Sequence, residues 1–332
     1  MKSKPVNRLA IIAELNKRKK EAAEKSAAPK FVIDEFCFNK QIDFIKDPAK
    51  FKTAVTSRRA GKTYSCAADI IYTAINKENI NVLYLTLNRL SAKRIIWKEI
   101  IKINKEYKLG GKINESELTL TFPNESIIYI SGAKDASEAN KFRGLSLYKI
   151  YIDEAQSFRG YLQNLIDDVL VPCLYDHDGS LILIGTPGPV LGGTFYEASH
   201  NSEWSNHRWT IFDNPWIEKK SGKKVEEILA NERKRRGITE SDPTYRRESL
   251  GEWVQDTDAL VFKFSPDLNI TDYIPPHHEL EFIFGIDIGW NDSDAIAVLG
   301  YHKTTKKVYL VEEWVKNKQT ITALVNKIEQ LL

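Results

Sequence analysis

Short apolar runs alternate with longer segments of helical periodicity over most of the chain. The runs at residues 149–152 and 181–185 are rich in Ile and Leu and lack alternating polar positions, as expected for strands that are buried on both faces. Such strands occur in parallel sheets that helices cover on both sides. We therefore predict an α/β fold with a mainly parallel sheet. Further strands are predicted at residues 51–56, 81–86 and 126–131, and helices at residues 63–74 and 89–103.

The pattern changes between residues 256 and 280, where prolines and aspartates interrupt any periodicity. Beyond this segment, three alternating runs and a last helical segment predict a β-meander that opens a second domain. The meander strands are placed at residues 282–288, 295–301 and 307–311, and the helix at 320–332. The predicted divisions are a basic N-terminal helical arm at residues 1–30, an α/β domain at 31–255, a linker at 256–280 and the second domain from 281 to 332.

Charge is distributed unevenly along the 332 residues, which include 48 Lys and Arg against 45 Asp and Glu. The first 30 residues carry a net charge of +6, whereas residues 256–332 carry −5. The arm therefore accounts for the formal excess, and it is predicted to dock on a partner or to form a solvated extension. DNA affinity of the middle region should depend on local patches of charge.

The three cysteines favour neither a disulfide framework nor a zinc cluster, because Cys37, Cys66 and Cys173 are far apart and form no CxxC pair. No apolar run approaches the roughly 18 residues that a membrane span needs. The first 30 residues also lack the apolar stretch of a secretion signal. These features predict a soluble protein of the cytoplasm with no membrane partner.

A phosphate-binding loop is predicted where the first strand leads into the next helix. Gly61, Lys62 and Thr63 stand at the head of that helix, where backbone N–H groups and the helix N-terminus hold phosphates. Lys62 would reach the β- and γ-phosphate oxygens, and the Thr63 hydroxyl would bind Mg²⁺. Thr56 occupies the position at which the GxxxxGK(S/T) pattern has its first glycine.

Two adjacent acids end the strand predicted at residues 149–152. Asp153 would hold Mg²⁺, and Glu154 would polarise the attacking water as a general base. An acidic pair after a strand is also typical of an ordinary helix N-terminus. Its combination with a lysine loop in an α/β chain favours a nucleotide site.

The strand predicted at residues 181–185 ends in Gly185, Thr186 and Pro187. A hydroxyl at the tip of a strand beside the water-activating acid can sense the γ-phosphate and transmit its loss. A plain turn explains the glycine and the proline equally well. We predict Gly185 and Thr186 as coupling residues.

Together these motifs resemble the large terminase subunit of tailed bacteriophages, the motor that packages DNA into procapsids and cuts it. The resemblance covers almost the whole chain after residue 31. It implies a P-loop NTPase fold of the ASCE or RecA-like type, with the ATPase domain at residues 31–255. The segments that carry it are Ser57-Arg58-Arg59-Ala60-Gly61-Lys62-Thr63, Phe142-Arg143-Gly144, Ile152-Asp153-Glu154-Ala155, Gly185-Thr186-Pro187, Asp213-Asn214-Pro215 and residues 245–253.

Further site residues follow only from this resemblance. Gln41 looks like the glutamine that recognises adenine, Arg58 like the P-loop arginine that contacts the γ-phosphate, and Arg143 like an arginine finger supplied to a neighbouring subunit. A polar residue on an exposed helix is the alternative for Gln41, and a surface loop residue for Arg143. The resemblance also implies nucleotide contacts from the whole P-loop, namely Ser57, Arg58, Arg59, Ala60, Gly61, Lys62 and Thr63.

The resemblance implies ATP and Mg²⁺ as cofactors. It implies double-stranded DNA, the portal protein and the small terminase subunit as partners. A ring of identical subunits is expected in the active motor, and a monomer is the alternative for the isolated protein.

Residues 281–332 resemble the first part of the RNase H-like nuclease domain of terminases. A buried strand at residues 284–288 would present Asp287 as the first metal-binding acid, and Asp294 follows closely. Two-metal cleavage with Mg²⁺ or Mn²⁺ needs several carboxylates around the scissile phosphate, and in the family the others lie later in the domain. We therefore expect a C-terminally shortened chain with an incomplete and inactive nuclease domain.

Two other functions share some of these features. A helicase-like DNA translocase has the first two motifs but normally needs a second RecA-like domain, which residues 256–332 do not resemble. An assembly or docking protein would use the nucleotide only to order a binding surface. Strand separation would favour the first, and tight ATP binding without turnover would favour the second.

Overall fold

A computed structural model describes residues 17, 31–255, 264, 266–289 and 293–331 of the chain. Apart from Lys17, the predicted N-terminal arm lies outside these residues, as does part of the predicted linker. The chain divides into two compact units, Met1–Ala259 and Leu260–Leu332. Within the described residues, the helices are too short or too polar to cross a membrane.

The first unit is built on an eight-stranded sheet in the order β3-β4-β5-β2-β6-β7-β1-β8. Neighbours from β5 to β8 in this order are parallel, whereas β3, β4 and β5 pair antiparallel. The predicted mainly parallel α/β fold is therefore confirmed. The strands are β1 Phe51–Thr56, β2 Asn81–Thr86, β3 Lys112–Asn114, β4 Thr119–Thr121, β5 Ile127–Gly132, β6 Lys149–Asp153, β7 Ser180–Gly185 and β8 Ser205–Trp209.

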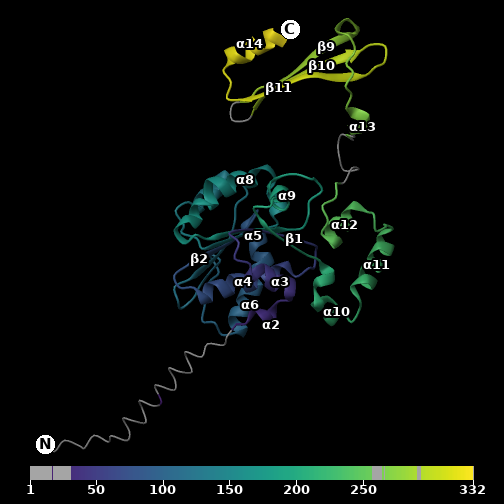
Figure 1. Ribbon diagram of the computed structural model, residues 1–332. Coiled ribbons are helices and arrows are strands. Elements are labelled where there is room, and N and C mark those ends of the chain that lie inside the picture. Colours follow the sequence, from purple (N-terminus) through teal and green to yellow (C-terminus); the bar gives the residue numbers. More distant parts are fainter. Residues whose placement is uncertain (1–16, 18–30, 256–263, 265, 290–292, 332) are drawn as a thin grey trace, which may run out of the picture. The chain divides into compact units, whose positions relative to one another are not determined.

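Helices cover both faces of this sheet (Figure 1). Because side chains alternate along a strand, Ala54 and Tyr84 enter one core, while their neighbours Val55 and Leu85 enter the other. The first core contains residues of α4 Lys62–Asn76 and α6 Lys98–Glu106, and the second contains residues of α8 Leu162–Leu165 and α9 Thr194–Ala198. The helix predicted at residues 89–103 forms as α5 Arg89–Ala92, a π-helical segment Lys93–Trp97 and α6.

A small helical group follows the last strand of the sheet. Ile211, Val225, Leu229 and Tyr245 form its core. It comprises α10 Pro215–Ser221, α11 Val225–Arg236 and α12 Pro243–Leu250. Other helical segments are α2 Ile33–Phe36, α3 Asn39–Lys46, α7 Ala136–Ala139, α13 Pro266–Asn269, the 3-10 segments Asn140–Phe142, Ala155–Tyr161, Pro172–His177, Ile211–Asp213 and His277–Glu279, and the π-helical segment Ile166–Leu170.

The second unit contains the predicted meander, with strand order β11-β10-β9, followed by a helix. Ile296 and Val298 of the middle strand pack with Leu324 of the helix on one face of the sheet. The prediction that the first strand of the meander is buried is wrong, because Ile283 and Ile286 are 57% and 43% exposed. The reason is its position at the edge of a small sheet. The elements are β9 Leu280–Asp287, β10 Ser293–His302, β11 Val308–Asn317 and α14 Ile321–Leu331.

Candidate nucleotide site

Three neighbouring parallel strands bring the predicted motifs to one edge of the sheet. β7 pairs with both β1 and β6, so their carboxyl ends lie together. The loop after β1, the two acids at the end of β6 and Gly185 at the end of β7 therefore meet there. Carboxyl ends of parallel strands are the usual place for ligands in open α/β sheets.

Side chains from other segments fix the carbonyl groups of the P-loop. Asn214 Nδ2 donates to the Arg59 carbonyl at 2.8 Å, and Trp209 Nε1 donates to the Ala60 carbonyl at 3.0 Å. Gly61, which caps α4, has a left-handed φ of 82°. In the part of the chain that the structure describes, the N–H groups of residues 59–63 have no protein acceptor. They form the set of donors that a phosphate requires.

Gln41 is buried, with 2% exposed, and is one of these supports. Its Nε2 donates to the Gly61 carbonyl at 3.0 Å. A Cβ atom on Gly61 would stand 2.8 Å from that same Nε2, so a larger residue there would displace the Gln41 amide. The exposed-helix alternative for Gln41 is therefore wrong, and its predicted contact with adenine stays a prediction.

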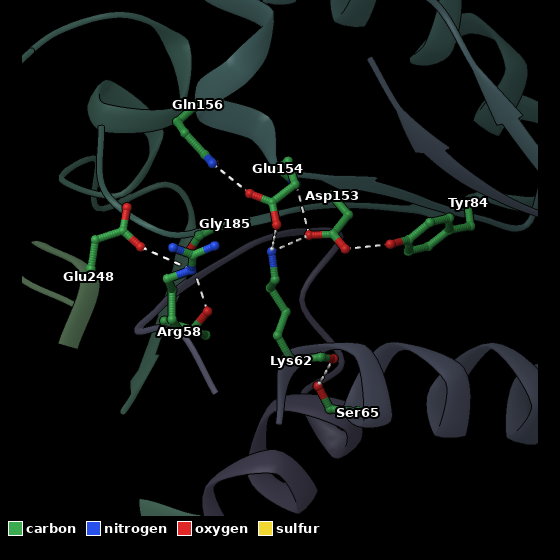
Figure 2. Close-up of polar contacts among 10 residues, drawn as sticks. Arg58, Lys62, Ser65, Tyr84, Asp153, Glu154, Gln156, Gly185 and Glu248 are labelled. Atoms are coloured by element: carbon green, nitrogen blue, oxygen red, sulfur yellow. Dashed lines mark hydrogen bonds and ion pairs between the residues drawn. The ribbon is translucent and has the colours of Figure 1, made fainter. Parts of the chain in front are cut away.

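Lys62 forms ion pairs with both predicted acids (Figure 2). Its Nζ lies 2.6 Å from Asp153 Oδ1 and 2.6 Å from Glu154 Oε1. Burial alone lowers the pKa of Lys62, but the two carboxylates outweigh it and hold this pKa above its usual value. Burial raises the pKa of Glu154, and Lys62 more than reverses that shift. Lys62 and Glu154 are therefore both charged at neutral pH.

Asp153 and Glu154 have further partners that the sequence did not indicate. The Tyr84 hydroxyl donates to Asp153 Oδ2, and Gln156 Nε2 donates to Glu154 Oε2 at 2.6 Å (Figure 2). Burial and the charge of Asp153 raise the pKa of Tyr84 well above its usual value, so its hydroxyl stays a donor. Tyr84 lies on β2 within an apolar run, and nothing in that run distinguishes it from a core residue.

The tip of β7 lies against this group of residues. The Thr56 hydroxyl donates to the Gly185 carbonyl at 3.4 Å. A Cβ atom on Gly185 would stand 2.2 Å from Gln156 Oε1. Thr186 follows and lines the same cavity as the P-loop. The structure thus brings both predicted coupling residues to the site.

The two predicted arginines differ in position. Arg58 Nε lies 3.2 Å from Glu248 Oε2, and the Arg58 N–H donates to the Glu248 carbonyl at 2.7 Å. The Arg58 side chain is 76% exposed. Arg143 is also exposed, donates from Nε to Asn140 Oδ1 at 3.0 Å, and does not line the P-loop cavity among the described residues.

A cavity of about 800 Å³ extends over the P-loop, which is in the size range of small-molecule sites. Ser57, Lys62 and Thr63 line it together with Glu154 and Thr186. Residues beyond the P-loop that also line it include Phe36, Ile95, Lys102, Tyr107, Trp216 and Ile217. The cavity has a charged end at Lys62 and Glu154, and the aromatic side chains Phe36, Tyr107 and Trp216 also line it.

The residues at the charged end fit Mg²⁺. The Thr63 hydroxyl and the buried Asp153 carboxylate are oxygen ligands, which this ion prefers. In P-loop sites the ion takes its other oxygens from phosphates and water. Groups of three or more His, Cys, Asp or Glu residues suited to a metal are absent from the described residues.

The two acids predicted for the nuclease site do not come together. Asp287 is exposed and pairs in register with Ala295 of β10, so it shares a face of the sheet with Ala295. Asp294, the preceding residue of β10, therefore lies on the opposite face. It is 2% exposed, and its Oδ1 accepts a hydrogen bond from the Gly289 N–H at 2.9 Å.

Comparisons with known proteins agree with the motifs. Residues 53–163 match the family described as terminase large subunit, T4likevirus-type, N-terminal. The large terminase subunit of Escherichia phage T5 is 24% identical over 301 residues, which are 84% of this chain and 63% of that protein. The chain thus spans 63% of the length of this curated relative. The resemblance predicted from the sequence is confirmed.

Solved structures share the fold. The large terminase of a thermophilic bacteriophage, in complex with ADP, has a TM-score of 0.53 and 16% identity, covering 89% of this chain and 74% of that one. The large terminase ATPase domain of Thermus phage P74-26 has a TM-score of 0.51 and 17% identity, covering 66% and 94%. The fold of a large terminase ATPase domain thus matches 66% of this chain.

Proposed function

We infer that this chain, a relative of the large terminase subunits of bacteriophages, is an ATPase whose hydrolysis of ATP drives double-stranded DNA into a procapsid. The observation that carries the proposal is the contact of Lys62 with both Asp153 and Glu154, beside P-loop N–H groups that have no acceptor in the described part of the chain. These are the groups that phosphoryl transfer to water requires.

The geometry supports a specific order of events. The triphosphate competes with the carboxylates for Lys62, and Lys62 moves to the β- and γ-phosphate oxygens. Glu154 Oε1 then accepts a proton from a water molecule whose oxygen attacks the γ-phosphorus. The bond between this phosphorus and the bridging oxygen breaks, and ADP leaves with that oxygen. Lys62 and Arg58 stabilise the charge on the phosphate oxygens.

Thr63 and Asp153 would hold Mg²⁺ in this site. The ion, when bound, neutralises charge on the phosphates. The Tyr84 hydroxyl orients the Asp153 carboxylate by its hydrogen bond to Oδ2. We also propose that Gln41, whose Nε2 donates to the Gly61 carbonyl, contacts the adenine.

The working motor is proposed to be a ring in the host cytoplasm that binds the portal protein and the small terminase subunit. Arg143 is exposed and outside the P-loop cavity, which suits an arginine that completes the site of a neighbouring subunit. Gly185 and Thr186 would transmit phosphate loss.

In the second unit, Asp287 is our candidate for a nuclease metal ligand. Asp294 is a less suitable candidate, because its Oδ1 already accepts a hydrogen bond from the Gly289 N–H.

Hydrolysis tests the site directly. Lys62→Ala and Glu154→Ala should each reduce phosphate release from ATP by at least about 100-fold, the lower end of the effect of removing a general base. Lys50→Ala is the control, because Lys50 precedes β1 at its opposite end and is exposed. Unchanged hydrolysis in either site variant would refute the assignment, and wild-type protein that binds ATP without turnover would favour a docking role.

A mixing experiment tests the trans arginine. Arg143→Ala and Glu154→Ala should each be inactive alone. Mixed in one ring, an Arg143→Ala subunit keeps its own Glu154 and receives Arg143 from its neighbour. We therefore expect the mixture to regain part of the wild-type rate. No recovery in rings shown to contain both subunits would mean that Arg143 acts within its own subunit.

A further inference from the structure

Gln156 donates a hydrogen bond to the proposed general base (Figure 2), and its amide oxygen lies close to Gly185 at the tip of β7. It belongs to the 3-10 segment Ala155–Tyr161 that follows the two acids. Its Nε2 donates to Glu154 Oε2 at 2.6 Å. Its Oε1 lies so close to Gly185 that a Cβ atom there would stand 2.2 Å away. One amide therefore contacts both the base and the coupling strand.

The two carboxylate oxygens of Glu154 have different donors. Oε1 is paired with Lys62 at 2.6 Å, whereas Oε2 accepts from Gln156 at 2.6 Å. When Lys62 moves to phosphate, Gln156 remains as the side-chain donor to Glu154. Its hydrogen bond then fixes the direction in which Oε1 faces the water.

The other end of the Gln156 amide is unsatisfied. Oε1 is buried, and no donor in the described part of the chain reaches it. A buried amide oxygen without a partner is unusual in proteins. A Cβ atom at position 185 would stand 2.2 Å from this oxygen, so a shift of the β7 tip toward it would displace the Gln156 amide. Because the same amide donates from Nε2 to Glu154, such a displacement would also change its hydrogen bond to the base.

We propose that Gln156 is a positioning residue that orients Glu154 toward the attacking water. It links this orientation to the tip of β7 at Gly185. The inference rests on the proposed ATPase function and adds the residue through which the phosphate-sensing strand acts on the base. Gln156 is not among the residues that line the P-loop cavity in the described part of the chain, so it would act through Glu154.

Gln156→Ala, made in the whole 332-residue chain, tests the orienting role. We expect kcat for ATP hydrolysis to fall about tenfold or more, as for loss of one charge-assisted hydrogen bond in the transition state, while KM for ATP stays within about twofold.

Gly185→Ala tests the link to β7. The new Cβ would clash with Gln156 Oε1, while Phe195 and the Ala155 backbone lie at 3.2 and 3.3 Å and need to shift only slightly. We expect a kcat loss similar to that of Gln156→Ala. In the double variant the clash is absent, so no further loss should occur. Gly188→Ala is the matched control, since its Cβ would meet the Gln156 Cβ at an ordinary 3.7 Å.

Binding of a fluorescent ADP analogue and the thermal unfolding midpoint verify that each variant is folded. Wild-type kcat in Gln156→Ala, or additive losses in the double variant, would overturn the inference while leaving the ATPase assignment intact. A folded wild-type protein that does not hydrolyse ATP, alone or with DNA and portal protein, would instead refute the proposed function.

Discussion

Asp69 carries a carboxylate into the core of the first unit, where it is 1% exposed. Lys149 Nζ lies 2.8 Å from its Oδ1 and 2.9 Å from its Oδ2, and the Tyr151 hydroxyl also donates to Oδ2. Burial raises the pKa of Asp69, but Lys149 and Lys52 outweigh it and hold this pKa below its usual 3.8. The pair thus joins α4, which begins at the P-loop, to β6, which ends at the two acids.

Asp69→Asn leaves the Lys149 ammonium buried without a counter-charge. We expect the free energy of unfolding at pH 7 to fall by about 3–5 kcal/mol, the usual cost of breaking a buried ion pair from one side. Urea denaturation measures the change. The control is Asp178→Asn, which removes the exposed partner of Lys50 and should change stability little. Equal losses in the two variants would contradict this role of Asp69.

The same carboxylate predicts a pH dependence. Because its pKa is lower in the folded chain than in the unfolded chain, Asp69 stabilises the fold fully above pH 3.8, and this contribution is lost as the pH falls through the folded-state pKa. The difference in unfolding free energy between wild type and Asp69→Asn should therefore shrink as the pH falls below 3.8. Denaturation at several acidic pH values tests this, and a constant difference would count against it.

At the scale of elements, the C-terminus of α12 is packed against the P-loop. Arg58 makes two contacts with Glu248, one with the carboxylate and one with the backbone carbonyl. Gly251, which ends α12, has a left-handed φ of 63°, and a Cβ atom there would stand 3.1 Å from the Ser57 nitrogen. The helical group after β8 is therefore in contact with the residues that would bind phosphate.

Gly251→Ala should strain the backbone at the end of α12 and bring a Cβ atom too close to the Ser57 nitrogen of the P-loop. We expect a loss of about 1 kcal/mol in unfolding free energy from the left-handed backbone, and several-fold weaker binding of ATP. Gly237→Ala is a matched control. Gly237 also ends a helix, has a φ of 67°, and has nothing within 4 Å of a Cβ atom. It should lose similar stability and keep its affinity for a fluorescent nucleotide.

The sequence predicted the elements whose local pattern is strong. β1, β6 and β7 follow from apolar runs, and the P-loop follows from its strand, loop and helix. The edge strand β8 was missed because Ser205, Asn206, His207 and Arg208 are polar, as an edge tolerates. Glu248 was not predicted as a site residue, because its contact with Arg58 joins distant positions and leaves no local periodicity. Gln156 was not predicted as a site residue either.

At the scale of the whole molecule, the chain has separate hydrophobic cores. The two large cores of the first unit and the small core of its helical group consist of residues between Phe31 and Trp253. The core of the second unit consists of residues between Phe284 and Leu331. Since no buried cluster among the described residues draws on both units, each should unfold in its own transition.

A chain that ends at Gln255 tests this independence and locates ATP binding. All residues that line the P-loop cavity precede this position. We expect the shortened chain to keep the wild-type affinity for a fluorescent ADP analogue and to unfold in calorimetry at the midpoint of one of the wild-type transitions. A chain that ends at Arg236 is the control, because it lacks α12 and its contacts with Arg58 and Ser57. If the chain that ends at Gln255 loses ADP binding, the second unit takes part in the nucleotide site. If only the chain that ends at Arg236 loses it, the contacts of α12 with the P-loop are what ADP binding requires.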